Sequence, residues 1–291
     1  PSEGFFAGRT ENLGDIRNTG VELLLTATPV QRRGFAWESR LNLATNKNEL
    51  LTFGQSGLFR SVLIGQAYGA VQENRAGYPL GGFWAQLPVR GANGGYTFNS
   101  RNVPVVDTAL TYLGPPAPTR EIGFSNTFTL FRNVRLYAQL DYKGGNKIFN
   151  YKEYNRCRFQ VNCERVNDIR VLAPGSAADS AFSRDVGIYR GQAVTTTGAP
   201  VNLFAPYVED GDFIKLRDVS VSFTIPSRFV AFSGASDASF TLAGRNLATL
   251  WTKYSGIDPE VNTYGNRSFV RVDAYAMPQN RRVTAAINVN F

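Results

Sequence analysis

Residues 283–291 read VTAAINVNF, and small or apolar side chains alternate with mostly polar ones along the stretch. One face would carry Val283, Ala285, Ile287, Val289 and Phe291. The opposite face would carry Thr284, Ala286, Asn288 and Asn290. A period of two indicates a β-strand with one apolar face, and a run of this length can cross a bilayer at a tilt.

The same alternation recurs at residues 21–27, 35–43, 122–130, 134–142, 219–223 and 240–242. The face opposite the apolar one carries charged residues, such as Glu38, Arg40, Arg135 and Asp141. No segment with a helical period is comparably strong, although a short helix is possible near residues 227–232. The sequence therefore predicts seven strands.

The connections between these strands alternate between short and long. Those at 29–34, 131–133 and 226–238 are short or moderate, whereas those at 45–119, 144–212 and 248–282 are long. Loops that long are unusual in compact soluble domains, and the alternation is typical of outer-membrane barrels. We expect an all-β fold, an antiparallel transmembrane β-barrel segment of about seven or more strands with long extracellular loops. A soluble β-sandwich is the alternative, and a further hairpin within residues 61–106 stays open.

Composition excludes several kinds of chemistry. The 291 residues include no His and only two Cys, so Ser-His-Asp catalysis and His-ligated zinc are excluded. The net charge is +8, but the Arg residues are scattered, and we predict no nucleic-acid binding. From the residues at hand we expect neither a signal peptide nor a transmembrane helix, because no basic stretch is followed by an apolar one and no apolar run is long enough. We predict no catalytic residue, cofactor or metal, and therefore no enzyme.

Several motifs occur in order along the chain. They are DIRNTGVELLL at 15–25, LNLATNKNELL at 41–51, YPLGGFW at 78–84, YVEDGDFIKLRDVSVS at 207–222, AGRNLATLWTKY at 243–254, GIDPE at 256–260 and the stretch 278–291. Together they resemble the C-terminal part of TonB-dependent outer-membrane transporters of the SusC/RagA type. The resemblance covers the chain from about residue 15 to residue 291.

The resemblance implies a protein of the bacterial cell outer membrane with a 22-stranded barrel. Residues 1–291 would be the C-terminal portion of that barrel, without the plug domain and the N-terminal strands. The implied function is TonB-dependent import of oligosaccharides or peptides. The implied partners are a SusD-like surface lipoprotein, the TonB complex acting through the absent N-terminal part, outer-membrane lipid, and the barrel-assembly machinery. That machinery would read the terminal strand, Val283, Ala285, Ile287, Val289 and Phe291.

Two other functions stay open, namely a passive porin-like barrel piece and a secreted soluble β glycan-binding module. An upstream plug would argue against the first, and solubility without detergent would favour the second.

Aromatic residues in the long loops are candidates for contact with substrate or with the lid. They are Tyr78, Phe83, Trp84, Tyr112, Tyr151, Tyr154, Trp251 and Tyr254. Their rings suit stacking on sugars, but they also suit packing between loops or an interfacial aromatic girdle.

Cys157 and Cys163 are candidates for a disulfide, which an oxidising envelope would favour. Two free thiols or a metal-binding pair are the alternatives. Four acidic residues, Asp210, Asp212, Asp258 and Glu260, invite a calcium or catalytic interpretation. The family resemblance instead implies structural loop residues.

Overall fold

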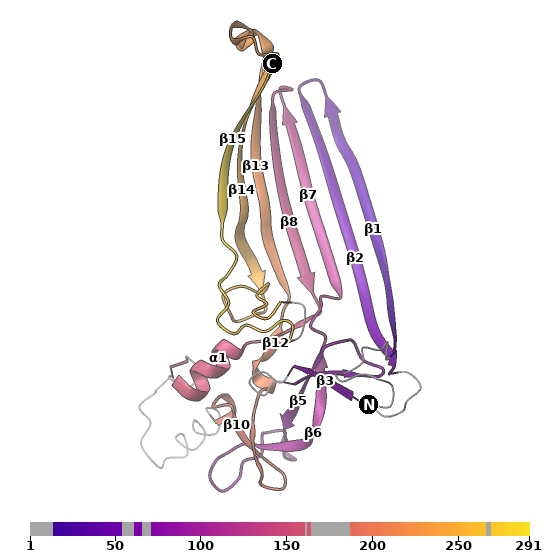
Figure 1. The fold of residues 1–291 in the computed structure, drawn as a ribbon, viewed down its shortest axis with the longest axis vertical. Helices are drawn as coiled ribbons and strands as arrows, with labels where there is room; N and C mark the ends of the chain where they lie inside the picture. The colour runs from indigo at the N-terminus through magenta and orange to yellow at the C-terminus, as the bar shows by residue number, and fades with distance from the viewer. Residues whose placement is uncertain (1–13, 54–60, 66–70, 161, 164–186, 266–268) are drawn as a thin grey trace, which may run out of the picture.

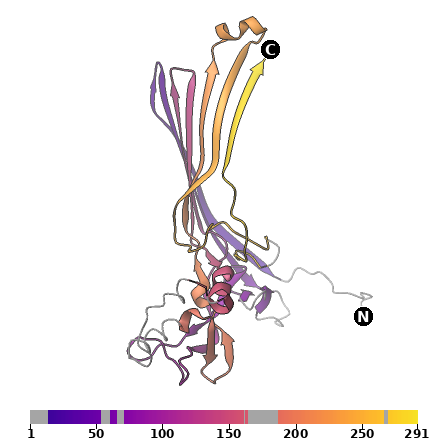
Figure 2. The same ribbon diagram turned by 90° about the vertical axis from the view of Figure 1, so that its left-hand side faces the viewer.

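The chain consists of a long antiparallel sheet and, at one end of it, a smaller body of loops and short strands (Figure 1, Figure 2). We call this smaller body, formed by the three long connections, the loop body. The computed structural model describes residues 14–53, 61–65, 71–160, 162–163, 187–265 and 269–291. The sheet runs along the longest axis of the molecule, with its hairpin turns and residue 291 at the end away from the loop body.

The long sheet has seven strands in the order β1, β2, β7, β8, β13, β14 and β15, and every neighbouring pair is antiparallel. Their bounds are Asp15–Arg32, Phe35–Thr52, Arg120–Leu130, Val134–Gly144, Phe213–Ile225, Asp237–Thr252 and Arg282–Asn290. Each of the seven predicted stretches corresponds to one of these strands, so the predicted antiparallel all-β class is confirmed.

The strand register places the apolar residues on one face of this sheet. One row across it reads Trp37, Phe128, Leu136, Val221, Leu242 and Ala285. Many apolar side chains on this face are exposed, including Leu25, Phe223 and Ile287. The face is therefore apolar over its whole width and uncovered by the described residues of the chain.

A polar contact joins two neighbouring strands on the apolar face. The Trp37 Nε1–H donates to Asn126 Oδ1 over 2.9 Å, which joins β2 to β7. A polar group on an apolar surface is costly unless it is hydrogen-bonded, so the two side chains satisfy each other.

Several strands are longer than predicted, β1 and β2 most of all. Between Thr45 and Glu49, β2 is polar on both faces, so the alternation ends while the backbone ladder to β1 continues to Thr52. Polar pairs accompany it there: Asn48 Nδ2 donates to Asn18 Oδ1 over 2.8 Å, and Arg17 pairs with Glu49 at 3.1 Å. Backbone pairing sets the strand length, and the apolar pattern reports only part of it.

The hairpin turns at the far end are short. Gly34 has φ +94°, which suits its place in the turn between β1 and β2. The turn between β7 and β8 places Phe131 and Arg132 at φ +50° and +66°. The Phe131 N–H donates to the Gly34 carbonyl over 2.7 Å, so the two turns are side by side. The segment 227–232, where a short helix was possible, forms two 3-10 turns, Ser227–Phe229 and Ala231–Ser233.

Two of the long connections contain strands of their own. A second sheet has the order β11, β10, β6, β5, β4, β3, with bounds Pro200–Asn202, Gln192–Thr195, Val105–Gly114, Gly82–Pro88, Val71–Arg75 and Ser61–Gly65. A third pairs β12, Val208–Asp210, with β9, Lys147–Phe149. The hairpin left open within 61–106 is present. The strands in 144–212 were not predicted, because they are too short to show a period.

The buried core lies in the loop body. It includes Phe83, Phe149, Tyr154, Tyr207 and Val272, which come from all three long connections. The helix α1, Tyr151–Asn155, and the π-helical turn Arg156–Gln160 pack at its edge. Among the described residues, no helix is long and apolar enough to span a membrane.

Candidate functional site

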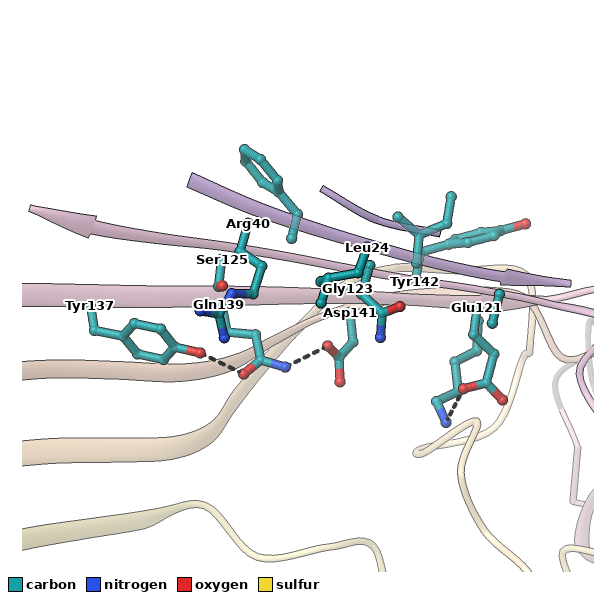
Figure 3. Close-up of a pocket in the computed structure, with 14 residues that line it drawn as sticks. Leu24, Arg40, Glu121, Gly123, Ser125, Tyr137, Gln139, Asp141 and Tyr142 are labelled. Carbon is teal, nitrogen blue, oxygen red and sulfur yellow. Dashed lines mark hydrogen bonds and ion pairs between the residues drawn. The ribbon is translucent and has the colours of Figure 1, made fainter. Parts of the chain in front are cut away.

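The polar face of the long sheet is hollowed over β2, β7 and β8, and this hollow is the candidate site (Figure 3). Its volume is about 510 Å³. Two rows of residues cross it: Arg40, Ser125 and Gln139, then Asn42, Gly123 and Asp141. Because Gly123 has no side chain, backbone forms the floor at that point. Three strands thus present hydrogen-bonding groups to one open surface.

The polar side chains of β8 form a chain of hydrogen bonds along the strand. Tyr137 donates its hydroxyl proton to Gln139 Oε1 over 2.9 Å, and Gln139 Nε2 donates to Asp141 Oδ1 over 2.9 Å. Figure 3 shows these three side chains on one side of the strands and Tyr142 on the other. The chain of bonds holds the Gln139 amide at its oxygen and at its nitrogen, so the protein itself sets the orientation of this amide.

Asp141 connects this chain to a cluster of ion pairs, which we call the latch. The latch consists of Asp141, Lys215, Arg217, Asp258 and Glu260. Arg217 Nε donates to Asp141 Oδ2 over 2.8 Å, and its two terminal nitrogens donate to the Glu260 carboxylate, each over 2.9 Å. Lys215 Nζ donates to Asp258 over 2.6 Å and to Glu260 over 2.7 Å. The latch therefore fastens the segment 253–265 to the polar face of the long sheet.

Burial makes the latch electrostatically strong. The Lys215 side chain is only 2% exposed and that of Asp258 6%. Burial by itself would raise the pKa of Glu260, but the hydrogen bonds from Arg217 and Lys215 outweigh it and lower that pKa to about 2. Glu260 is therefore ionised at neutral pH.

The four acidic residues that invited a calcium or catalytic interpretation all have cationic partners. Asp210 pairs with Lys147 at 2.8 Å, and Asp212 pairs with Lys253 at 3.3 Å. Asp258 and Glu260 belong to the latch. Charge neutralisation by Lys and Arg supports the structural interpretation of these carboxylates.

Arg40 is the cation of the hollow that is best placed for a solute. Its side chain is 55% exposed, and its ion pair with Glu38 is long, at 3.5 Å. The guanidinium can therefore reorient toward an anionic or hydrogen-bond-accepting group.

The loop aromatics divide by exposure. Five of the eight candidates are buried: Phe83, Trp84, Tyr151, Tyr154 and Tyr254. Tyr254 donates its hydroxyl proton to Asp273 Oδ2 over 2.8 Å, and burial together with the Asp273 charge raises the pKa of Tyr254 far above its usual value. In this conformation these rings pack the loop body.

Tyr78, Trp84 and Tyr112 form a cluster at the surface of the loop body. The ring of Tyr78 lies 4.7 Å from that of Trp84 and 4.9 Å from that of Tyr112. Arg75 stacks over Trp84 at 3.8 Å. Tyr78 is exposed and Tyr112 half-buried, so this cluster is the best-placed part of the predicted aromatic contact set.

Trp251 lies in a different environment. It pairs with Ile214 across β13 and β14, in the row that continues through Tyr142 and Ile122. The side chains in that row belong to the apolar face, and Figure 3 shows Tyr142 on the side of the strands opposite the polar side chains of the hollow. The position of Trp251 fits the interfacial girdle better than contact with a solute.

The structure joins Cys157 and Cys163 by a disulfide with a Cα–Cα distance of 4.9 Å. Both residues are fully buried beside Tyr154 and Phe204. Glu153 lies near them, at 3.7 Å from Cys157 Sγ. With both sulfurs in the disulfide, this group offers no thiolate to a metal.

The terminal strand residues Val283, Ala285, Ile287 and Val289 lie exposed on the apolar face, and Phe291 follows them at 87% exposure. β15 pairs only with β14 among the described strands. Recognition of this strand by the barrel-assembly machinery stays a prediction.

Sequence reasoning missed Arg217 as a functional residue. Strict alternation with Val219, Val221 and Phe223 would place it on the apolar face. A register shift between Leu216 and Asp218 moves it to the polar face, where it reaches Asp141 and Glu260. A charged residue that breaks an apolar period is the signal that would have suggested such a β-bulge.

The whole chain is similar to known transport proteins. It is 27% identical to the TonB-dependent receptor P26 of Formosa agariphila over 319 residues, which cover all of this chain and 31% of that protein. It is 22% identical to the TonB-dependent receptor SusC of Bacteroides thetaiotaomicron over 308 residues, which cover 99% of this chain and 28% of that protein. No protein-family model matches the chain.

Solved structures give the same fold. The chain superposes on the RagAB peptide transporter with a TM-score of 0.65 and 20% identity, covering all of this chain and 31% of that one. The chain thus spans about a third of the length of the relatives it matches. The resemblance to the SusC/RagA type is confirmed, and the relatives named here are receptors and transporters rather than enzymes.

Proposed function

We propose that this chain is the C-terminal portion of a TonB-dependent importer of the bacterial outer membrane. The observation that carries the proposal is the two-sided sheet: one face is apolar and uncovered, and the other is polar and hollowed. A sheet of this kind suits a wall with lipid on one side and a solute path on the other. The ordered similarity to TonB-dependent receptors over the whole chain supports the same function.

In the proposed orientation the short turns face the periplasm and the loop body faces outward. The polar face lines the path, and solutes are bound and passed through without covalent chemistry. The TonB complex would act through a plug outside residues 1–291. A SusD-like lipoprotein would cover the loop body and deliver the solute.

The solute class we propose is oligosaccharides or peptides. Gln139, Asn42 and Ser125 offer neutral hydrogen-bonding groups, and Arg40 offers a mobile cation. Such a surface suits solutes rich in hydroxyl or amide groups. The similarity to a structure described as a peptide transporter supports peptides, and the similarity to SusC-type receptors leaves oligosaccharides equally eligible.

The first experiment measures the mass and location of the native product. An antibody against residues 255–265 is used on the outer-membrane and soluble fractions of the source cell. We expect a membrane band several times heavier than the 32.0 kDa of this chain, with a heat-dependent shift in mobility. A 32 kDa soluble band would overturn the proposal and favour a secreted glycan-binding module.

The second experiment distinguishes the solute classes and the mechanism. Uptake of labelled oligosaccharides and labelled peptides is compared in cells with the native gene, without the gene, and with TonB removed. We expect uptake of one class to require both the gene and TonB. Uptake that requires the gene but not TonB would indicate a passive porin instead.

A further inference from the structure

The hairpin turns of the long sheet form a basic and aromatic surface that the import function does not use. The turn segments 32–34, 131–133 and 226–236 contain four Arg residues and no Asp or Glu. These are Arg32, Arg33, Arg132 and Arg228, and we call them the turn-end cations. All four are exposed. Among the ion pairs formed by described residues, none includes any of them.

The turns are neighbours, so these charges lie along one edge. The Phe131 N–H donates to the Gly34 carbonyl, and the Thr224 N–H donates to the Asn133 carbonyl, over 2.7 and 2.8 Å. These bonds tie the first turn to the second, and the second to the end of β13, two residues before the third turn. Two acidic residues close to this edge already have other partners. Asp237 accepts a hydrogen bond from Asn290, and Glu38 pairs with Arg40.

One of the turn-end cations, Arg32, borders the apolar face directly. Arg32 pairs with Phe35, and Phe35 belongs to the row of Leu130, Val134 and Phe223. Because directly opposed residues share a face, Arg32 lies at the last position of the apolar face. Three exposed rings accompany the cations: Phe131 at 79%, Phe229 at 57% and Phe232 at 92% exposure. Arg228 also stacks over the Phe229 ring at 4.7 Å. An apolar band that ends in aromatic rings and in cations without an acidic partner has the chemistry of a boundary between acyl chains and anionic headgroups.

We propose that the turn-end cations bind the headgroups of anionic phospholipids in the membrane leaflet at the hairpin end of the sheet. The inference rests on the proposed outer-membrane location. Each Arg can donate two parallel hydrogen bonds to a phosphate, and the exposed Phe rings anchor the turns at headgroup depth. The four unopposed positive charges favour anionic over zwitterionic lipid.

The test uses native mass spectrometry of the full-length protein, purified from the outer membrane in a mild detergent. Phosphatidylglycerol and phosphatidylethanolamine are added in equal amounts, and bound lipid is counted. We expect a several-fold preference for phosphatidylglycerol, which the triple variant Arg32→Gln, Arg132→Gln, Arg228→Gln loses. The matched control is Arg101→Gln, Arg120→Gln, Arg190→Gln, three exposed residues at the loop-body end. It should keep the preference.

Heat-dependent gel mobility establishes that both variants fold, which is expected because the replaced side chains are exposed. Equal binding of the two lipids, or equal loss in the control, would overturn the proposal. So would an acidic periplasmic protein that co-purifies through the turn-end cations while lipid preference is absent. A protein found only in the soluble fraction would instead overturn the proposed function.

Discussion

Lys215 shows how a single buried cation holds a distant segment. Its ammonium group contacts two carboxylates of the 253–265 segment and is almost completely shielded from water. Removing one partner of a buried ion pair leaves the other charge uncompensated, and this costs about 3 to 5 kcal/mol. An exposed pair contributes at most about 1 kcal/mol.

We expect Lys215→Met to loosen the 253–265 segment. Amide hydrogen exchange there should speed up by about a hundredfold, as a loss of about 3 kcal/mol requires. The control is Arg245→Met, because Arg245 is 70% exposed and pairs with Asp218 at 3.2 Å. Equal effects of the two substitutions would contradict the latch.

The pKa of Glu260 sets a pH dependence for the same contact. Its pKa is lowered from 4.5 to about 2, so ionised Glu260 is the form that the folded state favours. The stabilisation is complete above about pH 4.5 and is lost as the pH falls toward 2. We expect the protection factors of the 253–265 amides, which correct for the intrinsic pH dependence of exchange, to fall over that window in the wild type. In the variant Glu260→Gln, amide protection should depend less on pH over the same window. If it depends on pH as strongly as in the wild type, other titrating groups cause the effect.

At the scale of strands, Trp37 and Asn126 bind β2 to β7 on the apolar face. Trp37→Phe should leave Asn126 unpaired beside lipid and destabilise the sheet by about 1–3 kcal/mol. The double variant Trp37→Phe, Asn126→Val should recover much of this loss, because both polar groups are then absent. Urea unfolding of the full-length protein in lipid vesicles measures the free energy of unfolding of the wild type, the two single variants and the double variant. Additive effects of the two substitutions would show that the hydrogen bond contributes nothing.

The disulfide belongs to the scale of one loop element. It closes a short loop after α1, which should stabilise this part of the loop body by about 2 kcal/mol. In the wild type a reductant should therefore raise amide exchange across residues 151–160. The double variant Cys157→Ser, Cys163→Ser should show the faster amide exchange both with and without the reductant. A wild type that does not respond to a reductant able to reach the bond would indicate free thiols.

The whole molecule carries two unpaired sheet edges, since β1 and β15 each have a single neighbour among the described strands. In lipid, an open edge leaves backbone groups without partners. We expect residues 1–291 expressed alone to aggregate, and to gain strand structure only with the rest of a barrel. Circular dichroism and gel mobility of the isolated chain in detergent measure this, and a stable monomer with full strand content would contradict it.

The seven long strands, their antiparallel order and their two faces follow from the sequence. The physical reason is local: successive side chains of a strand point to opposite faces, so residues such as Phe35 and Trp37 report their environment directly. The family resemblance also follows from the sequence, because the motifs that carry it occur in order along the chain. The sequence also indicated which cysteines could pair.

Tertiary structure alone decided the latch and the loop body. Arg217 and Glu260 are far apart in the chain, and a β-bulge that no period shows brings Arg217 to the polar face. Trp84 and Tyr154 look like exposed loop rings in the sequence, but contacts between all three long connections bury them. Such contacts form between segments that are far apart in the chain, and the local pattern of side chains does not predict them.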